Sequence, residues 1–229
     1  LAKEAGAHAA KFQNFVAEKI VSKGGFDNLE GQLSHQSEWK KSVYETYEDA
    51  SLNSDWTNIL KETCDAADIT FFTSPYSFEL VDLVDEFIPA YKIGSGDVTW
   101  IEIIEYIATK NKPVMLATGA SDISDVNRAV NSILNINPNL VLMQCNTNYT
   151  AEYKNFSNLN LNVITTFQKM YPNIITGLSD HMPGCVAVLG AVSLGARVIE
   201  KHFTDSTKRI GPDHPFSMTP ETWSEMVDR

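Results

Sequence analysis

With 229 residues, of which 43% are hydrophobic and 21% charged, the chain has an ordinary globular composition and room for one large domain or two small ones. Its net charge of −11, its pI near 4.8 and the lack of a basic stripe exclude nucleic acid as the main partner. No apolar stretch is long enough to span a membrane and no signal-peptide pattern is present, so we expect neither a membrane partner nor export.

Short β-rich apolar segments recur along the chain, and most of them are separated by amphipathic stretches of helical length. They predict strands over residues 9–15, 69–73, 90–94, 113–118, 140–145, 174–178 and 198–203. Strands that alternate with helices indicate a parallel sheet, because parallel strands need crossover connections.

Three local patterns predict helix ends. Residues 1–6 resemble the last turns of a helix that Gly6 ends. Thr99 and Glu102 have the spacing of a capping box, which predicts a helix from there to residue 110. Pro183 suits the first turn of a helix that Gly195 ends. The long polar interval over residues 24–52 is predicted to be an active-site loop.

Polar residues follow every predicted strand, which favours a (β/α)₈ TIM barrel because its active site is assembled from many strand ends. An open doubly wound sheet is the alternative, but no glycine-rich phosphate loop follows an early strand. We predict one catalytic barrel domain over residues 1–229. A barrel begins with a strand, so we expect the first strand to precede this chain.

Lys11 and Lys92 lie within apolar strand segments, where a lysine is rare unless it is paired or functional. One interpretation is an ion pair with an interior carboxylate. A second is a clamp for a phosphate or carboxylate, supported by hydroxyl and backbone N–H groups at Ser95, Gly96 and Ser179. A third is a Schiff-base lysine.

His181 and His202 end two successive predicted strands, so their side chains are expected to meet. Two imidazoles leave other metal positions to water or substrate oxygens, which favours Mn²⁺ or Mg²⁺ over a closed zinc site. The alternative is a structural role for both histidines. Arg209 and Asp213 follow on a turn-rich loop that we expect at the barrel mouth. The three widely spaced cysteines read as reduced thiols, so the cytoplasm is the expected compartment.

Eight segments in order, AGAHAAKFQNF, FFTSPYS, IPAYKIGSGD, LATGA, QCNTNYT, GLSDH, EKHFT and GPDH, resemble the sialic acid synthase family of nonulosonic acid synthases. The resemblance covers nearly the whole chain. It implies a metal-dependent enzyme that condenses phosphoenolpyruvate with N-acetylmannosamine or a related N-acylated sugar. Phosphate would leave by C–O cleavage.

The resemblance also implies a role for each matching residue. Substrate-binding residues would be Lys11, Gln13, Ser74, Lys92, Ser95, Tyr149 and Ser179. His181 and His202 would hold the divalent metal, usually manganese. Asp97, which stands where the family commonly has glutamate, and Asp213 would be the catalytic carboxylates. Ala117 departs from the phosphate-binding serine of some members.

Two parts of the family pattern have no match here: a first strand that carries a glutamate, and a C-terminal antifreeze-like domain that supports a homodimer. The sugar also stays open between N-acetylmannosamine and diacetamido-trideoxy sugars. Two other functions fit the residues. One is a Schiff-base aldolase that uses Lys11 or Lys92, and the other is a non-catalytic sugar-phosphate binding module.

Overall fold

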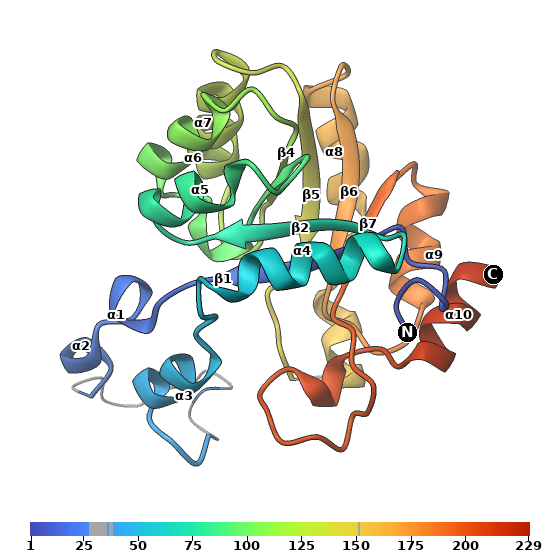
Figure 1. Ribbon diagram of the computed structural model, residues 1–229. Coiled ribbons are helices and arrows are strands. Elements are labelled where there is room, and N and C mark those ends of the chain that lie inside the picture. Colours follow the sequence, from blue (N-terminus) through green and yellow to red (C-terminus); the bar gives the residue numbers. More distant parts are fainter. Residues whose placement is uncertain (28–35, 37–38, 151) are drawn as a thin grey trace.

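The computed structural model describes residues 1–27, 36, 39–150 and 152–229, and a curled sheet of parallel strands forms its centre (Figure 1). The sheet has seven strands in the order of the chain, each paired in parallel with the next. The strands are β1 (Ala9–Asn14), β2 (Thr70–Pro75), β3 (Tyr91–Ile93), β4 (Val114–Ala117), β5 (Leu140–Cys145), β6 (Ile175–Asp180) and β7 (Val198–Lys201). All seven predicted strands are confirmed, and each bound differs by two residues at most.

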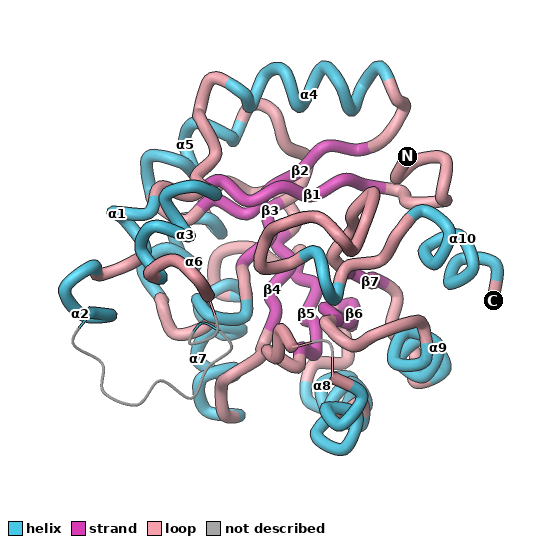
Figure 2. Tube along the Cα trace, turned by 90° about the horizontal axis from the view of Figure 1, so that it is seen from below, coloured by secondary structure: helices cyan, strands magenta, loops and turns pink. Residues whose placement is uncertain are grey.

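Helices lie around the outside of the strands (Figure 2). They are α1 (Ala17–Ile20), α2 (Lys23–Asp27), α3 (Val43–Ala50), α4 (Trp56–Ala66), α5 (Phe78–Asp85), α6 (Ile101–Ala108), α7 (Ile123–Leu134), α8 (Asn162–Met170), α9 (Val186–Ser193) and α10 (Pro220–Asp228). Short 3₁₀ turns are η2 (Ser95–Asp97), η3 (Tyr153–Asn158) and η4 (His214–Phe216). Within the described ranges, no helix combines the length and apolar character that crossing a membrane requires.

The sheet curls until its two edges face each other across one interior. In Figure 1, β1 and β2 run across β5 to β7 rather than alongside them. Lys11 of β1 and Glu200 of β7 form an ion pair of 2.7 Å, although the two strands are the opposite edges of the described sheet. The described strands therefore form a half-barrel of the α/β class, which supports the predicted barrel in part. The eighth strand stays a prediction.

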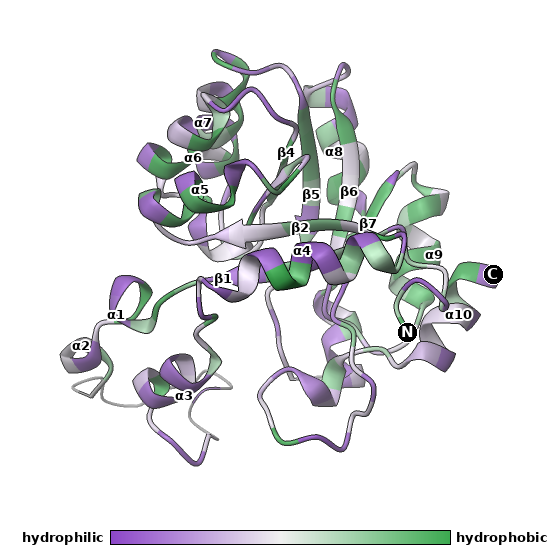
Figure 3. Ribbon diagram, in the orientation of Figure 1, coloured by the Kyte–Doolittle hydropathy of each residue, from purple (hydrophilic) through white to green (hydrophobic). Residues whose placement is uncertain are grey.

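The two faces of the sheet bury different side chains. On the outer face, Leu116 of β4 and Leu142 of β5 are fully buried against Ile104 of α6 and Ile133 of α7. The inner face has a smaller apolar group made by alternate residues of β4, β5 and β7, namely Met115, Ala117, Val141, Met143, Cys145 and Val198. Figure 3 shows β5 as strongly hydrophobic, whereas the loops that follow the strands are largely hydrophilic. Polar chemistry therefore collects at the carboxyl ends of the strands.

Two predicted helix starts are wrong. Helix α6 begins at Ile101 with Trp100 as its N-cap, and no side chain caps it. A backbone hydrogen bond from Trp100 N to Asp97 O, 2.9 Å long, extends the preceding turn and displaces Thr99 from the cap position. Pro183 likewise lies in the bend before α9, which begins only at Val186.

One predicted helix end is confirmed, whereas residues 1–6 form a hydrogen-bonded turn and not the last turns of a helix. The left-handed backbone of Gly6 (φ +93°) follows a single turn, and Ala7 N bonds to Ala2 O, the pattern of a Schellman motif. Gly195 (φ +96°) ends α9 in the same conformation.

The predicted loop over residues 24–52 is only partly a loop, because it contains most of α2 and all of α3. Residues 28–35 and 37–38 of that interval lie outside the described residues. In the described part, the Tyr47 ring of α3 packs 5.6 Å from the ring of Phe15, directly after β1.

The close approach of β6 to β7 predicts a stability effect at Gly177. A Cβ there would lie 2.5 Å from the carbonyl oxygen of Val198 and 3.2 Å from Met143 Cγ. Gly177→Ala should therefore lower the free energy of unfolding by about 1–3 kcal/mol, measured by urea denaturation. Gly24→Ala is the matched control, because no atom lies within 4 Å of its added Cβ. Equal effects of the two substitutions would contradict the prediction.

Candidate active site

Two lysines and one carboxylate form a buried ion cluster inside the curled sheet. Lys11 Nζ lies 2.7 Å from Glu200 Oε1, and Lys92 Nζ of β3 lies 3.1 Å from Glu200 Oε2. The Lys92 side chain is only 3% exposed. The interpretation in which both lysines pair with an interior carboxylate is therefore confirmed, and whether they also bind an anionic substrate stays a prediction.

Glu200 is held in its charged form by this cluster. Burial alone would raise the pKa of its carboxyl group, but the charges of Lys11 and Lys92 outweigh burial and hold the pKa well below its usual range. Glu200 is absent from the predicted site residues. The two-residue period of a strand was the available signal, because it places Glu200 on the same face of β7 as His202.

Hydroxyl groups from neighbouring strand ends surround the ion cluster. Ser95 of η2 accepts a hydrogen bond of 2.8 Å from the Thr147 hydroxyl, and Ser179 of β6 is buried. Within the described residues, Ser74 Oγ of β2 is buried without a hydrogen-bond partner. Glu200 Oε2 also lacks a well-oriented hydrogen bond, despite its short ion-pair distance to Lys92. Unsatisfied buried polar atoms are costly, so these two mark space for a polar ligand.

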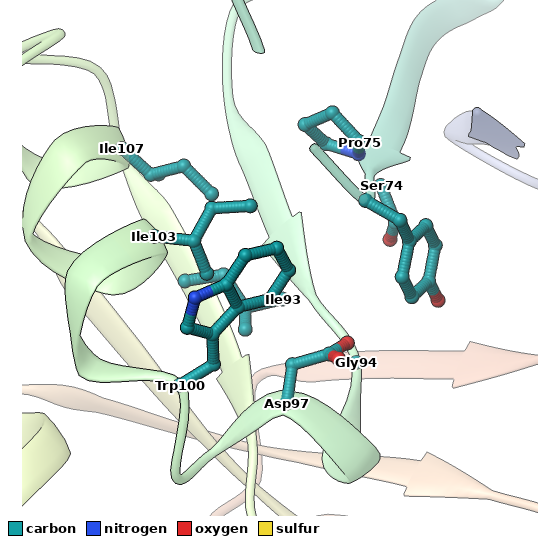
Figure 4. Close-up of a pocket in the computed structure, with 9 residues that line it drawn as sticks. Ser74, Pro75, Ile93, Gly94, Asp97, Trp100, Ile103 and Ile107 are labelled. Atoms are coloured by element: carbon teal, nitrogen blue, oxygen red, sulfur yellow. The ribbon is translucent and has the colours of Figure 1, made fainter. Parts of the chain in front are cut away.

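Asp97 lies on a small cavity next to the ion cluster. Ser74, Asp97 and Trp100 are among the residues that line it, and its volume of about 10 Å³ suits one water molecule (Figure 4). Figure 4 shows the Asp97 carboxylate pointing toward the Ser74 side of this cavity. Burial raises the pKa of Asp97 to about 6, although the charge of Lys92 opposes the shift. Opposite lies Tyr76, whose hydroxyl accepts a hydrogen bond of 2.9 Å from Gln13 Nε2.

Four aromatic and imidazole rings form the other half of the site. The ring of Tyr149 lies 4.3 Å from that of His181 and 6.2 Å from that of His202. The two histidine rings are 5.3 Å apart, and Phe216 of η4 packs against His202 at 4.9 Å. Asp213 Oδ2 lies 3.5 Å from His202 Nδ1. The predicted approach of the two histidines is thus present.

Both imidazoles are suited to the neutral form that metal ligands need. Burial lowers the pKa of His181, and burial together with the neighbouring His181 lowers that of His202 to about 3. His181 Nδ1 lies 3.0 Å from the carbonyl oxygen of Asn146, which makes Nδ1 the donor and leaves Nε2 as the ligand atom. Among the described residues, no group of three or more His, Cys, Asp or Glu side chains is arranged as a metal site. The two imidazoles therefore fit an open site that water or substrate would complete.

An outward-facing ion pair fixes the turn that carries His181. Lys201 Nζ lies 2.5 Å from Asp180 Oδ2 and donates to the Met182 carbonyl at 2.7 Å. Asp180 Oδ1 accepts from Met182 N at 2.9 Å. Both charged side chains are 1% exposed, so the turn on either side of His181 has little freedom.

Nine of the eleven predicted site residues lie at or after the carboxyl ends of the strands, and the other two, Lys11 and Lys92, lie within β1 and β3. Lys11, Lys92, Ser74, Ser95, Ser179 and Asp97 lie on the ion-cluster half; Gln13, Tyr149, Asp213, His181 and His202 lie toward the ring half. Arg209 of the mouth loop pairs instead with Asp205 at 3.0 Å. Besides Glu200, the prediction missed Tyr76, Thr147 and Phe216, which are uncharged and indistinguishable in sequence from packing residues.

The ion cluster predicts a pH-dependent stability. Glu200→Gln leaves the buried Lys92 and the partly exposed Lys11 without their counter-ion, so the free energy of unfolding should fall by about 3 kcal/mol at pH 7. The folded-state pKa of Glu200 is depressed, so its contribution is complete above the ordinary value of 4.5 and is lost as the pH falls below it. Urea denaturation of both proteins from pH 7 to pH 3 should show the difference shrinking. A difference constant with pH would contradict this account.

Comparisons with known proteins agree with this geometry. The chain is 36% identical over 229 residues to an uncharacterized protein of Methanocaldococcus jannaschii, covering 99% of this chain and 62% of that protein. It is 32% identical to N,N'-diacetyllegionaminic acid synthase of Legionella pneumophila, covering 99% of this chain and 64% of that enzyme. A crystal structure of N-acetylneuraminic acid synthetase from Leptospira borgpetersenii superimposes with a TM-score of 0.85 at 26% identity, over 99% of this chain and 73% of that one.

The chain thus spans somewhat over three fifths of the length of these curated relatives. The model of one protein family matches it from residue 1 to residue 229. On this match and on the identities above, the chain belongs to the NeuB family, whose curated relatives include synthases of sialic-type acids.

Proposed function

We propose that this protein condenses phosphoenolpyruvate with an N-acylated amino sugar and releases phosphate, as a synthase of a nonulosonic (sialic-type) acid. One observation carries the proposal: Glu200 joins two interior lysines, and His202, two residues further along β7, faces its neutral partner His181. The part of the site that holds the lysines, which suits an anionic substrate, therefore adjoins the part that holds the histidines, which suits a metal and a sugar.

The lysine half suits phosphoenolpyruvate because that substrate carries a carboxylate and a phosphate. Lys11 and Lys92 would bind these anionic groups while Glu200 keeps the two ammonium groups in place. The unpartnered Ser74 hydroxyl and the hydroxyls of Ser95 and Ser179 would donate further hydrogen bonds. Such positioning turns an encounter of two molecules into a reaction within one complex.

The ring half suits the sugar. Gln13, Tyr149 and Asp213 would bind its hydroxyl and acylamino groups, and the open-chain aldehyde would point toward the histidines. A divalent ion held by His181 and His202, Mn²⁺ or Mg²⁺, would supply Lewis-acid polarisation of the aldehyde oxygen.

The reaction then balances with one water molecule. C3 of phosphoenolpyruvate attacks the aldehyde carbon, and C2 develops positive charge. Water adds at C2 and loses a proton, for which Asp97 and Asp213 are the candidate acceptors. The tetrahedral intermediate loses its C2 hydroxyl proton and expels phosphate through C–O cleavage, leaving a 2-keto acid. The two protons of the water end on the former aldehyde oxygen, which becomes a hydroxyl, and on the phosphate. The pH dependence of the reaction in variants of Asp97 distinguishes between these two carboxylates.

Three wider expectations belong to this proposal. An eighth strand would join β1 to β7 and close the barrel, and in relatives of this kind it would carry a further glutamate. The full-length protein would form a homodimer and act in the cytoplasm. The sugar would be N-acetylmannosamine or a diacetamido-trideoxy sugar, because curated relatives are named as synthases of N-acetylneuraminate 9-phosphate, legionaminic acid and pseudaminic acid.

A Schiff-base aldolase is the first rival. It needs Nζ of Lys11 or Lys92 free to attack a carbonyl carbon, whereas Glu200 holds the two Nζ atoms at 2.7 and 3.1 Å. The geometry therefore favours the anion clamp. Borohydride trapping of a pyruvate adduct would support the rival.

Phosphate release tests the proposal. The full-length protein is incubated with phosphoenolpyruvate and each candidate sugar, with Mn²⁺, with Mg²⁺ and with EDTA. We expect release with at least one sugar, its loss in EDTA, and its recovery with Mn²⁺. His181→Ala and His202→Ala should each lower release by at least about 100-fold and weaken Mn²⁺ binding measured by calorimetry.

Two outcomes would contradict the proposal. Activity that is indifferent to EDTA would favour the Schiff-base mechanism. Tight binding of phosphoenolpyruvate without release from any sugar, with either metal, would favour a non-catalytic sugar-phosphate binding module.

The raised pKa of Asp97 predicts a pH profile. If Asp97 accepts the proton, it must be ionised, so kcat/KM, which reports the free enzyme, should rise with pH through about 6 and then level off. Asp97→Asn should lower kcat by about 10²–10⁴-fold and remove this rise, while Asp97→Glu should keep most of the activity. An unchanged profile in Asp97→Asn would assign the rise to another group, with Asp213 next to be tested.

A further inference from the structure

Thr147 carries a hydroxyl group at the strand ends that the proposed reaction does not use. It lies in the loop after β5, and its hydroxyl donates a hydrogen bond of 2.8 Å to Oγ of Ser95, which follows β3. Ser95 is one of the predicted substrate-binding residues, and it is only 7% exposed. The contact joins the ends of two strands that are not neighbours in the sheet, because β4 lies between β3 and β5.

The direction of this hydrogen bond decides what the Ser95 hydroxyl can do. A serine hydroxyl has one hydrogen to donate and two lone pairs that accept. Because Thr147 donates to Ser95 Oγ, the hydrogen of Ser95 points toward a different acceptor. A hydroxyl that accepts one hydrogen bond is also polarised, which strengthens the bond that it donates. Ser95 is therefore prepared to donate to an anionic oxygen.

The chain admits this contact only because residue 119 is glycine. A Cβ atom on Gly119 would lie 1.8 Å from Thr147 Oγ1 and 3.1 Å from Ser95 Cβ. The Thr147 hydroxyl thus occupies the space that a larger side chain at residue 119 would need. The φ angle of Gly119 lies outside the left-handed region, so the backbone angle does not itself demand glycine. The side-chain contact between Thr147 and Ser95 is what requires it.

The surroundings of the contact suit an anion. Cys145 Sγ lies 3.7 Å from Thr147 Oγ1, and burial raises the pKa of this thiol, which keeps it neutral. The positive charge of Lys92 opposes that rise, so its field reaches the place where Thr147 and Ser95 meet. A polarised donor therefore lies close to an ammonium charge and beside a neutral thiol.

We propose that Thr147 is a positioning residue, which orients the Ser95 hydroxyl so that Ser95 donates to an anionic oxygen of the bound substrate. Thr147 acts through Ser95 and does not itself contact the substrate. The inference rests on the proposed function only in that phosphoenolpyruvate supplies the anion. The alternative is a structural role, in which the bond between two strand ends stabilises the fold and leaves the affinity for an anion unchanged.

Calorimetric titration of the full-length protein with phosphoenolpyruvate tests the inference. Thr147→Val keeps the shape of the side chain and removes the donor, so the Kd should rise by about tenfold. Thr147→Ser keeps the hydroxyl and should hold the Kd within about twofold of the unmodified value. Gly119→Ala keeps both hydroxyls but displaces Thr147 Oγ1, so it should raise the Kd as Thr147→Val does.

A double-mutant cycle shows whether Thr147 acts through Ser95. In a Ser95→Ala background, Thr147→Val should change the Kd by less than about twofold, because the hydroxyl that Thr147 orients is absent. Thr176→Val is the matched control. The buried Thr176 hydroxyl accepts from Gln168 Nε2 at 3.1 Å, on the face of β6 opposite to Ser179, so its loss should leave the Kd unchanged. Urea denaturation checks that each variant is folded, and Gly119→Ala decides the matter if Thr147→Val is not.

The role of Thr147 and the synthase proposal fail in different ways. An unchanged Kd in Thr147→Val and Gly119→Ala, or an equal effect of Thr147→Val with and without Ser95, would overturn the role of Thr147 alone. Binding that follows the expected pattern without phosphate release would contradict the synthase proposal and support the role of Thr147. No binding of phosphoenolpyruvate up to about 10 mM would overturn both.

Discussion

Lys11, Lys92 and Glu200 neutralise one another inside the sheet, and the arrangement of the site depends on this contact. Taking charged groups out of water is costly, and the cost is met only when opposite charges lie in contact with good geometry. Here the carboxylate lies 2.7 and 3.1 Å from the two ammonium groups. The same contact links β1 to β7, which are not hydrogen-bonded to each other in the described sheet. The curvature that brings the strand ends together is therefore stabilised by the residues that a substrate would meet.

Because side chains alternate along β6 and β7, the inner and outer faces of these two strands carry different groups. On the inner side, Glu200 and His202 face the candidate active site. On the outer side, Lys201 pairs with Asp180 and holds the Met182 carbonyl, with both charged groups 1% exposed. The turn around His181 is thus fixed by an ion pair on the face of the sheet opposite to Glu200. If His181 binds a metal, contacts behind it such as this ion pair would help to fix the geometry of the metal site.

The strands could be predicted because they follow from repeating patterns, whereas the roles of the eleven site residues follow from the family resemblance and stay predictions. Apolar runs located every strand, and polar residues after each run located the strand ends. The start of α6 could not be predicted, because a backbone bond to Asp97 O, rather than the Thr99 pattern, decides it. The strand period places Glu200 on the same face as His202, but its two lysine partners became apparent only once the curl of the sheet brought β1 and β3 to β7. Contacts between β1, β3 and β7 depend on closure in three dimensions, which no local pattern encodes.

Asp97 and Glu200 show how contact with lysine separates the pKa values of two buried carboxyl groups. Burial by itself would raise the pKa of both carboxyl groups. Glu200 touches two ammonium groups and stays ionised, whereas Asp97 feels Lys92 only as a weaker opposing charge and titrates at about 6. An anion bound by Lys92 would offset the charge that now opposes the shift at Asp97. Anion binding would then raise the pKa of Asp97 further and favour its protonated form. Under the proposed function, proton transfer at Asp97 would in this way be coupled to an anion bound by Lys92, through a charge that both carboxylates share.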